Sequence, residues 1–471
     1  MIKFGTGGWR TIIGEDFIKS NIIKVAHGLS VKMAKENCKE QGVVIGFDRR
    51  FLSVEAAKWM AEVLAHYGVK VYFIDKIAPT PMIMYTVKQL GCHYGIAITA
   101  SHNPAEYNGI KVFTSGGKDA SEEVTSELED IISEIFSEST DAKTFENGVK
   151  EEVIEIINPF NDYIDAIMEK IDTDAIRNKQ LRILLDPMYG VSKTSLQTIL
   201  LSSRCEVDLI HDRHDTLFGG RLPSPSAETL NTLKQKVVEK GYDLGLGTDG
   251  DADRLGVIDN EGNFIHPNEI LVLIYYYLLN YKHQKGPVVR NIATTHLLDA
   301  IAEDYGEECY EVPVGFKHIS SKMEEKDAIL GGESSGGLTI AGHIKGKDGV
   351  FAASVLVEMV AVTGLSIAEM LNSIYNKYGE YHMVEYGYSF NAEDRQKLIE
   401  ILYHDKTIPE FGYDIDKIST VDGIKVYFKN GGWVVIRFSG TEPLLRVFAE
   451  MDTIEEAEKV CKQVEQFIKE C

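Results

Sequence analysis

The sequence predicts an α/β protein with three consecutive α/β domains, built on mixed and mainly parallel sheets, and a C-terminal α+β domain. The chain has 471 residues, which at roughly 100–200 residues per domain corresponds to three or four domains. Apolar runs alternate with amphipathic helical segments through most of the chain, as in parallel sheets covered on both faces. Its C-terminal part instead has closely spaced apolar runs joined by short turns.

The first domain is expected over residues 1–150. Its periodicity predicts helices at 17–36 and 54–66 and strands at 43–47, 69–74 and 95–98. Ser53 precedes the second helix and is a candidate N-cap, because its hydroxyl can accept from a free backbone N–H.

The second and third domains are expected over residues 151–254 and 255–370, where strands and helices continue to alternate. The second has predicted strands at 181–185, 205–210 and 242–246 and helices at 190–201 and 226–240. The boundaries are expected in the acidic stretch 140–156, in the acidic loop near residue 254 and in the segment 365–382.

The fourth domain is expected over residues 371–471. Its predicted strands lie at 423–428, 432–438 and 445–450, and its helices at 392–402 and 453–469. Asn430-Gly431-Gly432 favours a tight hairpin turn, so the strands on either side are expected to pair antiparallel.

Composition narrows the classes of function. The chain is 44% hydrophobic and 26% charged, as is typical of globular proteins. Its net charge of −23, from 72 acidic and 49 basic residues, argues against nucleic acid as a partner, since phosphate backbones need a basic surface. Local Arg and Lys can still bind an anionic small molecule.

Cysteine spacing and hydropathy exclude further classes. The six cysteines are scattered without a CxxC pair, so the sequence predicts neither a disulfide framework nor a zinc site. No apolar run reaches the roughly 18 residues of a membrane span, and Met1-Ile2-Lys3 does not begin a signal peptide. A cytoplasmic protein without a membrane partner is expected.

The segment 249–254 reads Asp-Gly-Asp-Ala-Asp-Arg and indicates a metal site. Carboxylates at i, i+2 and i+4 of a tight loop turn oxygens toward one point, which suits a hard cation such as Mg²⁺. A calcium EF-hand is excluded, because Asn260 stands where its twelfth-position Glu is needed and no helices flank the loop.

The segment 99–104 reads Thr-Ala-Ser-His-Asn-Pro and follows a predicted strand. Most loop serines are only turn residues. Here Ser101 adjoins His102 in a chain that has a predicted metal site but no nucleotide loop, which suggests phosphoryl transfer through a phosphoserine.

Two other patterns are rejected. Gly245, Gly247 and Gly250 fit GxGxxG, but a dinucleotide site needs a helix next and the residues 255–259 read as a strand. The residues 211–215 mix His, Asp and Arg, and a solvated polar loop explains them better than a metal cluster.

Five segments, in order across the whole chain, resemble the motifs of the α-D-phosphohexomutases, the phosphoglucomutase/phosphomannomutase superfamily. They are the segments 4–10, 99–104, 249–254, 331–337 and 437–443. This resemblance implies four domains around a central cleft. It also implies that Ser101 is phosphorylated in the active enzyme and completes one Mg²⁺ site together with Asp249, Asp251 and Asp253.

The resemblance implies roles for further residues. Arg10 and Arg254 would contact the phosphoserine. His102, Lys111 and Lys347 are candidates for proton transfer, and the sequence does not choose among them. Residues expected to bind the substrate are Glu333 and Ser335 for sugar hydroxyls, Lys317 over the sugar, and Arg437, Ser439, Gly440 and Thr441 for the phosphate that does not react.

The predicted function is interconversion of hexose 1-phosphate and hexose 6-phosphate, with glucose as first and mannose as second choice of sugar. A hexose 1,6-bisphosphate would be both intermediate and activator, the partners would be small sugar phosphates, and the enzyme would be a monomer or homodimer. One alternative is a phosphoglucosamine mutase, which the opening Gly5-Thr6-Gly7-Gly8 disfavours. Another is a metal-dependent sugar-phosphate phosphatase, which would not need a separate site for a phosphate that does not react.

Overall fold

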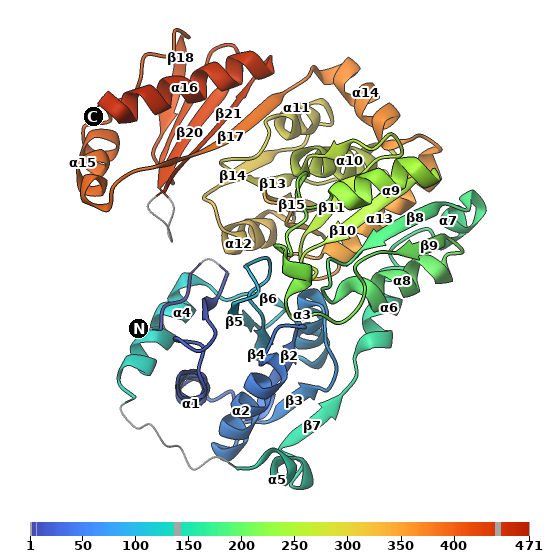
Figure 1. Cartoon of the computed structure of the whole chain (residues 1–471), viewed down its shortest axis with the longest axis vertical. Coiled ribbons are helices and arrows are strands. Elements are labelled where there is room, and N and C mark those ends of the chain that lie inside the picture. The colour runs from blue at the N-terminus through green and yellow to red at the C-terminus, as the bar shows by residue number, and fades with distance from the viewer. Residues whose placement is uncertain (1, 6, 136–142, 439–443, 471) are drawn as a thin grey trace.

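The computed structural model describes residues 2–5, 7–135, 143–438 and 444–470. Within these ranges four β-sheets follow one another along the chain, three mixed and the last antiparallel. The first and fourth sheets lie at opposite ends of the arc that the chain forms in Figure 1, with the second and third between them. The predicted class, three α/β units and a C-terminal α+β unit, is confirmed.

The first sheet has the order β1-β5-β4-β2-β3-β7, with β6 paired to β5. Its strands are β1 (Trp9–Ile12), β2 (Val43–Phe47), β3 (Val71–Ile74), β4 (Tyr94–Ile98), β5 (Tyr107–Thr114), β6 (Lys118–Asp119) and β7 (Ile154–Ile157). The helices are α1 (Lys19–Lys35), α2 (Ser53–His66), α3 (Thr80–Leu90), α4 (Glu122–Ser133) and α5 (Phe145–Lys150). Side chains alternate along β2: Val43 and Ile45 pack in the core with α1 and α2, and Val44 packs with α3.

The second sheet has the order β12-β11-β10-β8-β9. Its strands are β8 (Arg182–Asp186), β9 (Glu206–Leu209), β10 (Leu244–Thr248), β11 (Leu255–Ile258) and β12 (Phe264–Ile265). Its helices are α6 (Phe160–Met168), α7 (Thr173–Lys179), α8 (Ser192–Ser202) and α9 (Asn231–Lys240), with a 3₁₀ turn at Phe218–Gly220. Because β11 is a strand, the rejection of a dinucleotide-binding GxGxxG is consistent with the structure.

The third sheet has the order β14-β13-β15-β16. Its strands are β13 (Val288–Asn291), β14 (Cys309–Val312), β15 (Leu330–Gly332) and β16 (Leu338–Ile340). Its helices are α10 (Pro267–Asn280), α11 (Leu297–Asp304), α12 (Phe316–Lys326), α13 (Gly349–Thr363) and α14 (Ile367–Tyr378). The apolar helix α13 is buried, and its core cluster reaches into the first and second sheets, so the three α/β units share one core.

The fourth sheet is antiparallel with the order β17-β21-β20-β19-β18. Its strands are β17 (His382–Ser389), β18 (Ile415–Ser419), β19 (Ile424–Phe428), β20 (Trp433–Phe438) and β21 (Leu444–Met451). The helix α16 (Ile454–Glu470) packs on it, while α15 (Arg395–Ile399) continues as a π-helical turn at Glu400–His404. The predicted turn joins β19 to β20, with Gly431 at a φ of 95° that favours glycine.

The expected domain boundaries cut across two of these sheets. The strand β7 lies after residue 150 but pairs with β3, and β11 and β12 lie after residue 254 but pair with β10 and with each other. A sheet keeps its edge strands because their backbone groups need hydrogen-bond partners. We therefore propose that the first domain ends after β7 and the second after β12.

The cap proposed for α2 is wrong. Leu52 is the N-cap, in the left-handed region at a φ of 64°, and no side chain caps the helix. The Ser53 hydroxyl donates instead to Asp48 Oδ1, at 2.9 Å.

Among the described residues, no single helix is long and apolar enough to cross a bilayer. The helices α13 and α14 pass that test only as a pair, and the chain bends by 80° between them.

Candidate active site

Ser101 lies in the loop of residues 99–104, hereafter the Ser101 loop, which follows β4. Its side chain is fully buried, and its φ of 53° lies in the left-handed region, which is uncommon for a non-glycine residue. The backbone N–H of Ser101 donates to Thr99 Oγ1, at 2.8 Å, and Thr99 Oγ1 donates to Asp48 Oδ2, at 2.6 Å. These two hydrogen bonds hold the backbone of the loop at Ser101, and the backbone in turn fixes the position of the Ser101 hydroxyl.

Arg50 binds the backbone of the Ser101 loop. This residue was not predicted from the sequence. Its buried guanidinium donates to four backbone carbonyl oxygens at 2.6–2.9 Å, those of Ser101, Asn103, Pro104 and Tyr107. Its Cζ atom also lies over the ring of Phe218, 4.8 Å from the ring centroid. A single cation therefore fixes the course of the loop.

The three carboxylates of residues 249–254, hereafter the acidic loop, meet at one point after β10. Asp249, Asp251 and Asp253 are buried, and their ligand oxygens all lie within 4.8 Å of one another. Ser101 Oγ donates to Asp249 Oδ2, at 2.9 Å. Asp251 Oδ1 and Asp253 Oδ1 are buried without a hydrogen-bond partner. Unpartnered buried carboxylate oxygens are costly, and a bound cation would satisfy them, so the donor set fits a hard divalent ion.

The close approach of the two loops depends on Gly250. A Cβ atom at this position would lie 2.7 Å from the carbonyl oxygen of Ser101. Any side chain would push the loops apart, which explains why a glycine stands between the first two aspartates.

Two lysines face the acidic loop. Lys111, on β5, donates to Asp251 Oδ2 and Asp253 Oδ2, both at 2.7 Å, and Lys347 Nζ lies 3.1 Å from Asp253 Oδ2. Burial opposes the charge of Lys111, but the two carboxylates outweigh it and raise the pKa of its ammonium group. Burial likewise opposes ionisation of Asp253, but Lys111 and Lys347 hold the pKa of that carboxyl well below its ordinary value.

The surroundings of His102 disfavour its charged form, whereas those of Lys111 favour it. Its Nδ1 lies 3.4 Å from Ser101 Oγ. Burial, reinforced by the charges of Arg254 and Arg10, holds the pKa of the imidazole well below its ordinary value. The ring is therefore neutral near pH 7.

The two predicted arginines lie at this cluster. Arg10, on β1, donates from Nη1 to Asn103 Oδ1, at 2.8 Å. The backbone N–H of Arg254 donates to Asp249 Oδ1, at 3.0 Å, and its guanidinium faces Asp253 at 4.0 Å. Burial lowers the pKa of Arg10, which keeps its charge because that pKa is so high at the outset.

Glu333 and Ser335 lie in the loop between β15 and β16. Ser335 Oγ donates to Glu333 Oε1, at 2.7 Å. This loop touches the acidic loop through an isolated β-bridge between Gly337 and Arg254. A Cβ atom on Gly337 would lie 2.3 Å from the Cδ atom of Lys347, so the loop also adjoins that lysine.

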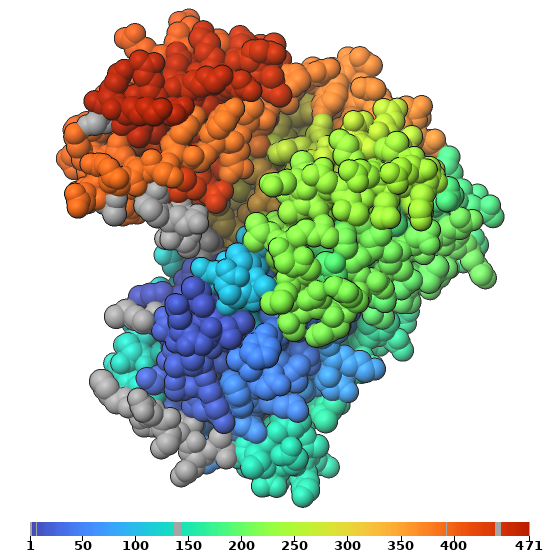
Figure 2. All heavy atoms as spheres, in the orientation of Figure 1, coloured from blue at the N-terminus to red at the C-terminus, as the bar shows by residue number. Residues whose placement is uncertain are grey.

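A cavity of about 610 Å³ connects the first, third and fourth domains. Its lining includes Lys111 from β5, Lys317 from α12 and Arg437 from β20. Figure 2 shows a hollow between the blue N-terminal part and the orange and red C-terminal part. Lys317 pairs with Glu122 at 2.9 Å and Arg437 with Asp422 at 2.9 Å, so each of these two cations has a carboxylate partner that also lines the cavity.

The structure thus brings Ser101, His102, Lys111 and the acidic loop together, and it places Arg437 across a cavity. Ser439, Gly440 and Thr441, expected beside Arg437, lie outside the described residues, as does Thr6 of the opening loop.

Models of one protein family match nearly the whole chain. Phosphoglucomutase/phosphomannomutase alpha/beta/alpha domains I, II and III match residues 1–139, 161–262 and 266–378, and the C-terminal domain of the same family matches residues 391–467.

Whole proteins with this organisation are also similar. A phosphoglucomutase/phosphomannomutase of Thermococcus kodakarensis is 30% identical over 96% of this chain and 95% of that protein. A phosphoglucosamine/phosphogalactosamine mutase of Sulfurisphaera tokodaii is 29% identical over 95% and 94%. The crystal structure of a protein from Thermus thermophilus, described as a phosphomannomutase, covers 99% of both chains with a TM-score of 0.86 and 26% identity.

Proposed function

The chain belongs to the phosphoglucomutase/phosphomannomutase family of the α-D-phosphohexomutases, and we propose that it interconverts hexose 1-phosphate and hexose 6-phosphate through a phosphorylated Ser101. The main support is the contact of Ser101 Oγ with Asp249, at 2.9 Å, inside a cluster of carboxylates and cations. Arg437 is a further cation, on the other side of the cavity. Its guanidinium can bind the phosphate group of the substrate that does not react.

In the proposed cycle, the phosphoryl group on Ser101 Oγ passes to the free 6-hydroxyl of a hexose 1-phosphate, which breaks the bond to Oγ and forms a hexose 1,6-bisphosphate. The 6-hydroxyl loses its proton and Oγ takes one up, so that Ser101 is again a free hydroxyl. The bisphosphate turns over within the cavity. Its 1-phosphate then returns to Ser101, and hexose 6-phosphate leaves. Closing the cavity around the sugar would exclude water, which otherwise hydrolyses the phosphoserine.

His102 is the proposed proton acceptor at the sugar hydroxyl. Its neutral ring keeps a lone pair on one nitrogen, and its Nδ1 atom lies 3.4 Å from Ser101 Oγ. Lys111 is held as a cation by two carboxylates and is a poor base, so it serves to balance charge. Lys347, also paired with Asp253, would act in the same way.

Asp249, Asp251 and Asp253, together with the Ser101 phosphate, are the proposed ligands of one Mg²⁺ ion. The support is the all-oxygen donor set and its two unpartnered buried oxygens. Bound there, Mg²⁺ would neutralise charge on the transferred phosphoryl group. Arg10 and Arg254 are proposed to contact the same phosphate.

Glu333 and Ser335 are proposed to bind two neighbouring sugar hydroxyls, an arrangement that still works after the sugar turns over. Arg437 and Lys317 are proposed to hold the distal phosphate and the sugar edge. Arg437 supplies a fork of N–H donors that matches phosphate oxygens.

Glucose phosphate is the proposed first substrate and mannose phosphate the second. The two sugars differ in one inverted hydroxyl, which a pocket distinguishes by only about 1–3 kcal/mol. Glucosamine phosphate is the alternative substrate, because the similar protein of Sulfurisphaera tokodaii is named for amino sugars.

The test is a mutase assay on the purified protein with Mg²⁺ and a trace of glucose 1,6-bisphosphate. Glucose, mannose and glucosamine 1-phosphates are compared, and free phosphate is monitored alongside. The proposal expects 6-phosphates without free phosphate, formed fastest from glucose 1-phosphate. Release of free phosphate as the main product would identify a phosphatase and contradict the proposal.

A further inference from the structure

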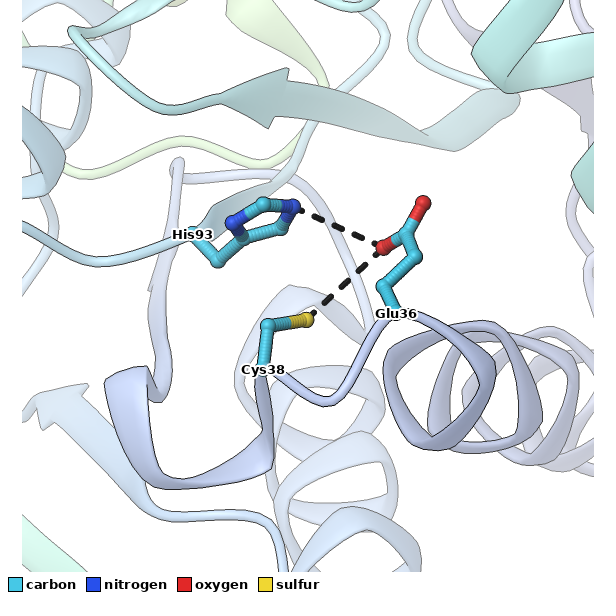
Figure 3. Close-up of side chains that lie close together, drawn as sticks. All are labelled: Glu36, Cys38 and His93. Carbon is cyan, nitrogen blue, oxygen red and sulfur yellow. Dashed lines mark hydrogen bonds and ion pairs between the residues drawn. The ribbon is translucent and has the colours of Figure 1, made fainter.

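We propose that Glu36, Cys38 and His93 form a second metal site, for a divalent transition ion of the Zn²⁺ type, in the first domain. Figure 3 shows the three side chains pointing toward one another. Glu36 is the C-cap residue of α1, Cys38 follows two residues later, and His93 directly precedes β4. One ligand atom from each lies within 4.8 Å of the other two.

Two of the three donor separations are close to those that tetrahedral coordination requires, and all three are within 4.8 Å. Glu36 Oε2 lies 3.5 Å from His93 Nε2 and 3.7 Å from Cys38 Sγ. A zinc ion bound at about 2.0–2.1 Å by nitrogen and oxygen and at about 2.3 Å by sulfur requires donor separations of roughly 3.3–3.6 Å. The carboxylate oxygen therefore needs to move by only a few tenths of an ångström toward each partner to share an ion with it.

The imidazole is oriented as metal-binding histidines are. His93 Nδ1 lies 3.1 Å from the side-chain oxygen of Gln41, which can only accept. The Nδ1 atom therefore bears a hydrogen, and in the neutral ring Nε2 presents its lone pair to Glu36 Oε2. Two acceptors then face each other at 3.5 Å, and they can be joined either by a proton on Nε2, which makes the contact an ion pair, or by a metal ion between them.

The carboxylate is also held in place. Lys32 Nζ lies 2.9 Å from Glu36 Oε1, and the Tyr94 hydroxyl donates to both carboxylate oxygens at 3.0 and 2.8 Å. These contacts turn Oε2 toward Cys38 and His93. The side chains of Glu36 and His93 are 29% and 35% exposed, so an ion can enter from solvent and keep one position for water.

The chemistry of the donors separates this site from the acidic loop. Thiolate and imidazole select zinc-like ions, whereas three carboxylates suit Mg²⁺. Binding would displace the Cys38 thiol proton to solvent. Because His93 precedes β4 and Ser101 follows it, the two sites lie at opposite ends of that strand, so the second site would fasten α1 to β4 and take no part in phosphoryl transfer.

Cobalt(II) is the direct probe, used with the full-length protein in excess Mg²⁺ so that the acidic loop is occupied. A thiolate-to-cobalt absorption band is expected at one equivalent, together with the visible bands of tetrahedral cobalt, and Zn²⁺ should abolish both. The thiolate band reports sulfur ligation, which three carboxylates cannot produce. Cys38→Ser and His93→Gln should bind the ion more than about 100-fold more weakly, beyond the 10–100-fold typical of losing a group that only orients a ligand.

Two variants make the test specific. Cys309→Ser, at a partly exposed cysteine of the third domain, should keep the band. Gln41→Ala, at an exposed residue whose loss is tolerable to folding, should weaken binding by about 10–100-fold. The absence of a thiolate band in the wild-type protein, or a band that persists in Cys38→Ser, would overturn the proposal and leave His93 and Glu36 as an ordinary ion pair.

Discussion

The serine that is proposed to transfer phosphate lies beside a histidine whose environment keeps it neutral. Burial and two nearby arginines hold the pKa of His102 well below its ordinary value, so the ring is neutral throughout the physiological pH range. The environment of Lys111 has the opposite effect, because its two carboxylate partners raise the pKa of its ammonium group. The roles of the two residues thus follow from the charges around them.

His102→Gln should lower kcat by about 10²–10⁴-fold with little change in KM, the range expected for loss of a general base. Steady-state kinetics with the preferred hexose 1-phosphate measure both constants. His66→Gln, at the exposed end of α2, is the matched control and should behave as wild type. If kcat of His102→Gln is within threefold of wild type, His102 is not the general base, and one of the two lysines has that role.

At this scale the sequence predicts those residues whose partners lie within one short motif. Ser101 and the three aspartates each belong to a hexapeptide, and the structure brings both hexapeptides together. Arg50 was not predicted, because its carbonyl partners lie more than fifty residues away and backbone oxygens leave no mark in a sequence. Glu36 and His93 were missed for the same reason, since only the fold of the first sheet brings them together.

Among the elements, the Ser101 loop is the one whose shape the reaction needs most. Its left-handed serine costs free energy, which the donors of Arg50 offset by binding four carbonyl oxygens. A lysine has the same charge but only a single ammonium group, which cannot reach four acceptors at once.

Arg50→Lys should therefore lower kcat by at least about 10²-fold, because a displacement of about 1 Å at the reacting group costs that much. The fold should persist, as judged by circular dichroism. Arg177→Lys, at an exposed arginine of α7, serves as the control and should leave kcat unchanged. Normal turnover in Arg50→Lys would show that the loop keeps its shape without this residue.

In the fourth domain, the strands that were not predicted are the partly exposed ones. β18 reads Ile-Asp-Lys-Ile-Ser and is mostly exposed at the edge of the fourth sheet, so it lacks an apolar run. β17 alternates intermediate and exposed positions. The buried strands β19 and β20, by contrast, are continuous apolar runs and were predicted nearly to the residue.

In the whole molecule, a buried lysine joins the third and fourth domains. Lys425, on β19, is 1% exposed and donates to the carbonyl oxygen of Ile292 and to Glu311 Oε2, both at 2.7 Å. Its ammonium group also lies 4.2 Å from the ring centroid of Trp433. The fourth domain is thus anchored to the third, which fixes the position of Arg437 across the cavity.

Lys425→Met should reduce the free energy of unfolding by about 3 kcal/mol, because it breaks a buried ion pair with Glu311. We expect the lower end of the usual range, because Glu311 still forms an ion pair with Arg290. Urea unfolding followed by tryptophan fluorescence measures the change. Lys417→Met, at an exposed lysine on the neighbouring strand, should change stability by less than about 0.5 kcal/mol. Equal stability of the two variants would show that the buried lysine does not hold the domains together.

Arg437→Ala tests the far side of the cavity. Loss of charged hydrogen bonds to a phosphate, worth about 1.5–3 kcal/mol, should raise KM about 10–100-fold for both the 1-phosphate and the 6-phosphate, because each places its phosphate there in one half of the cycle. Arg446→Ala, which removes a half-exposed partner of Glu385, should leave KM unchanged. An unchanged KM in Arg437→Ala would place the clamp elsewhere.

The most direct test of the phosphoserine cycle is to follow one phosphate. The protein is incubated with glucose 1,6-bisphosphate that bears labelled phosphorus, the labelled residue is located by peptide mass spectrometry, and unlabelled glucose 1-phosphate is then added. The account predicts label on Ser101, its transfer to the sugar after the addition, and no labelling of Ser101→Ala. Mutase activity with an unlabelled Ser101, or label released as free phosphate, would contradict it.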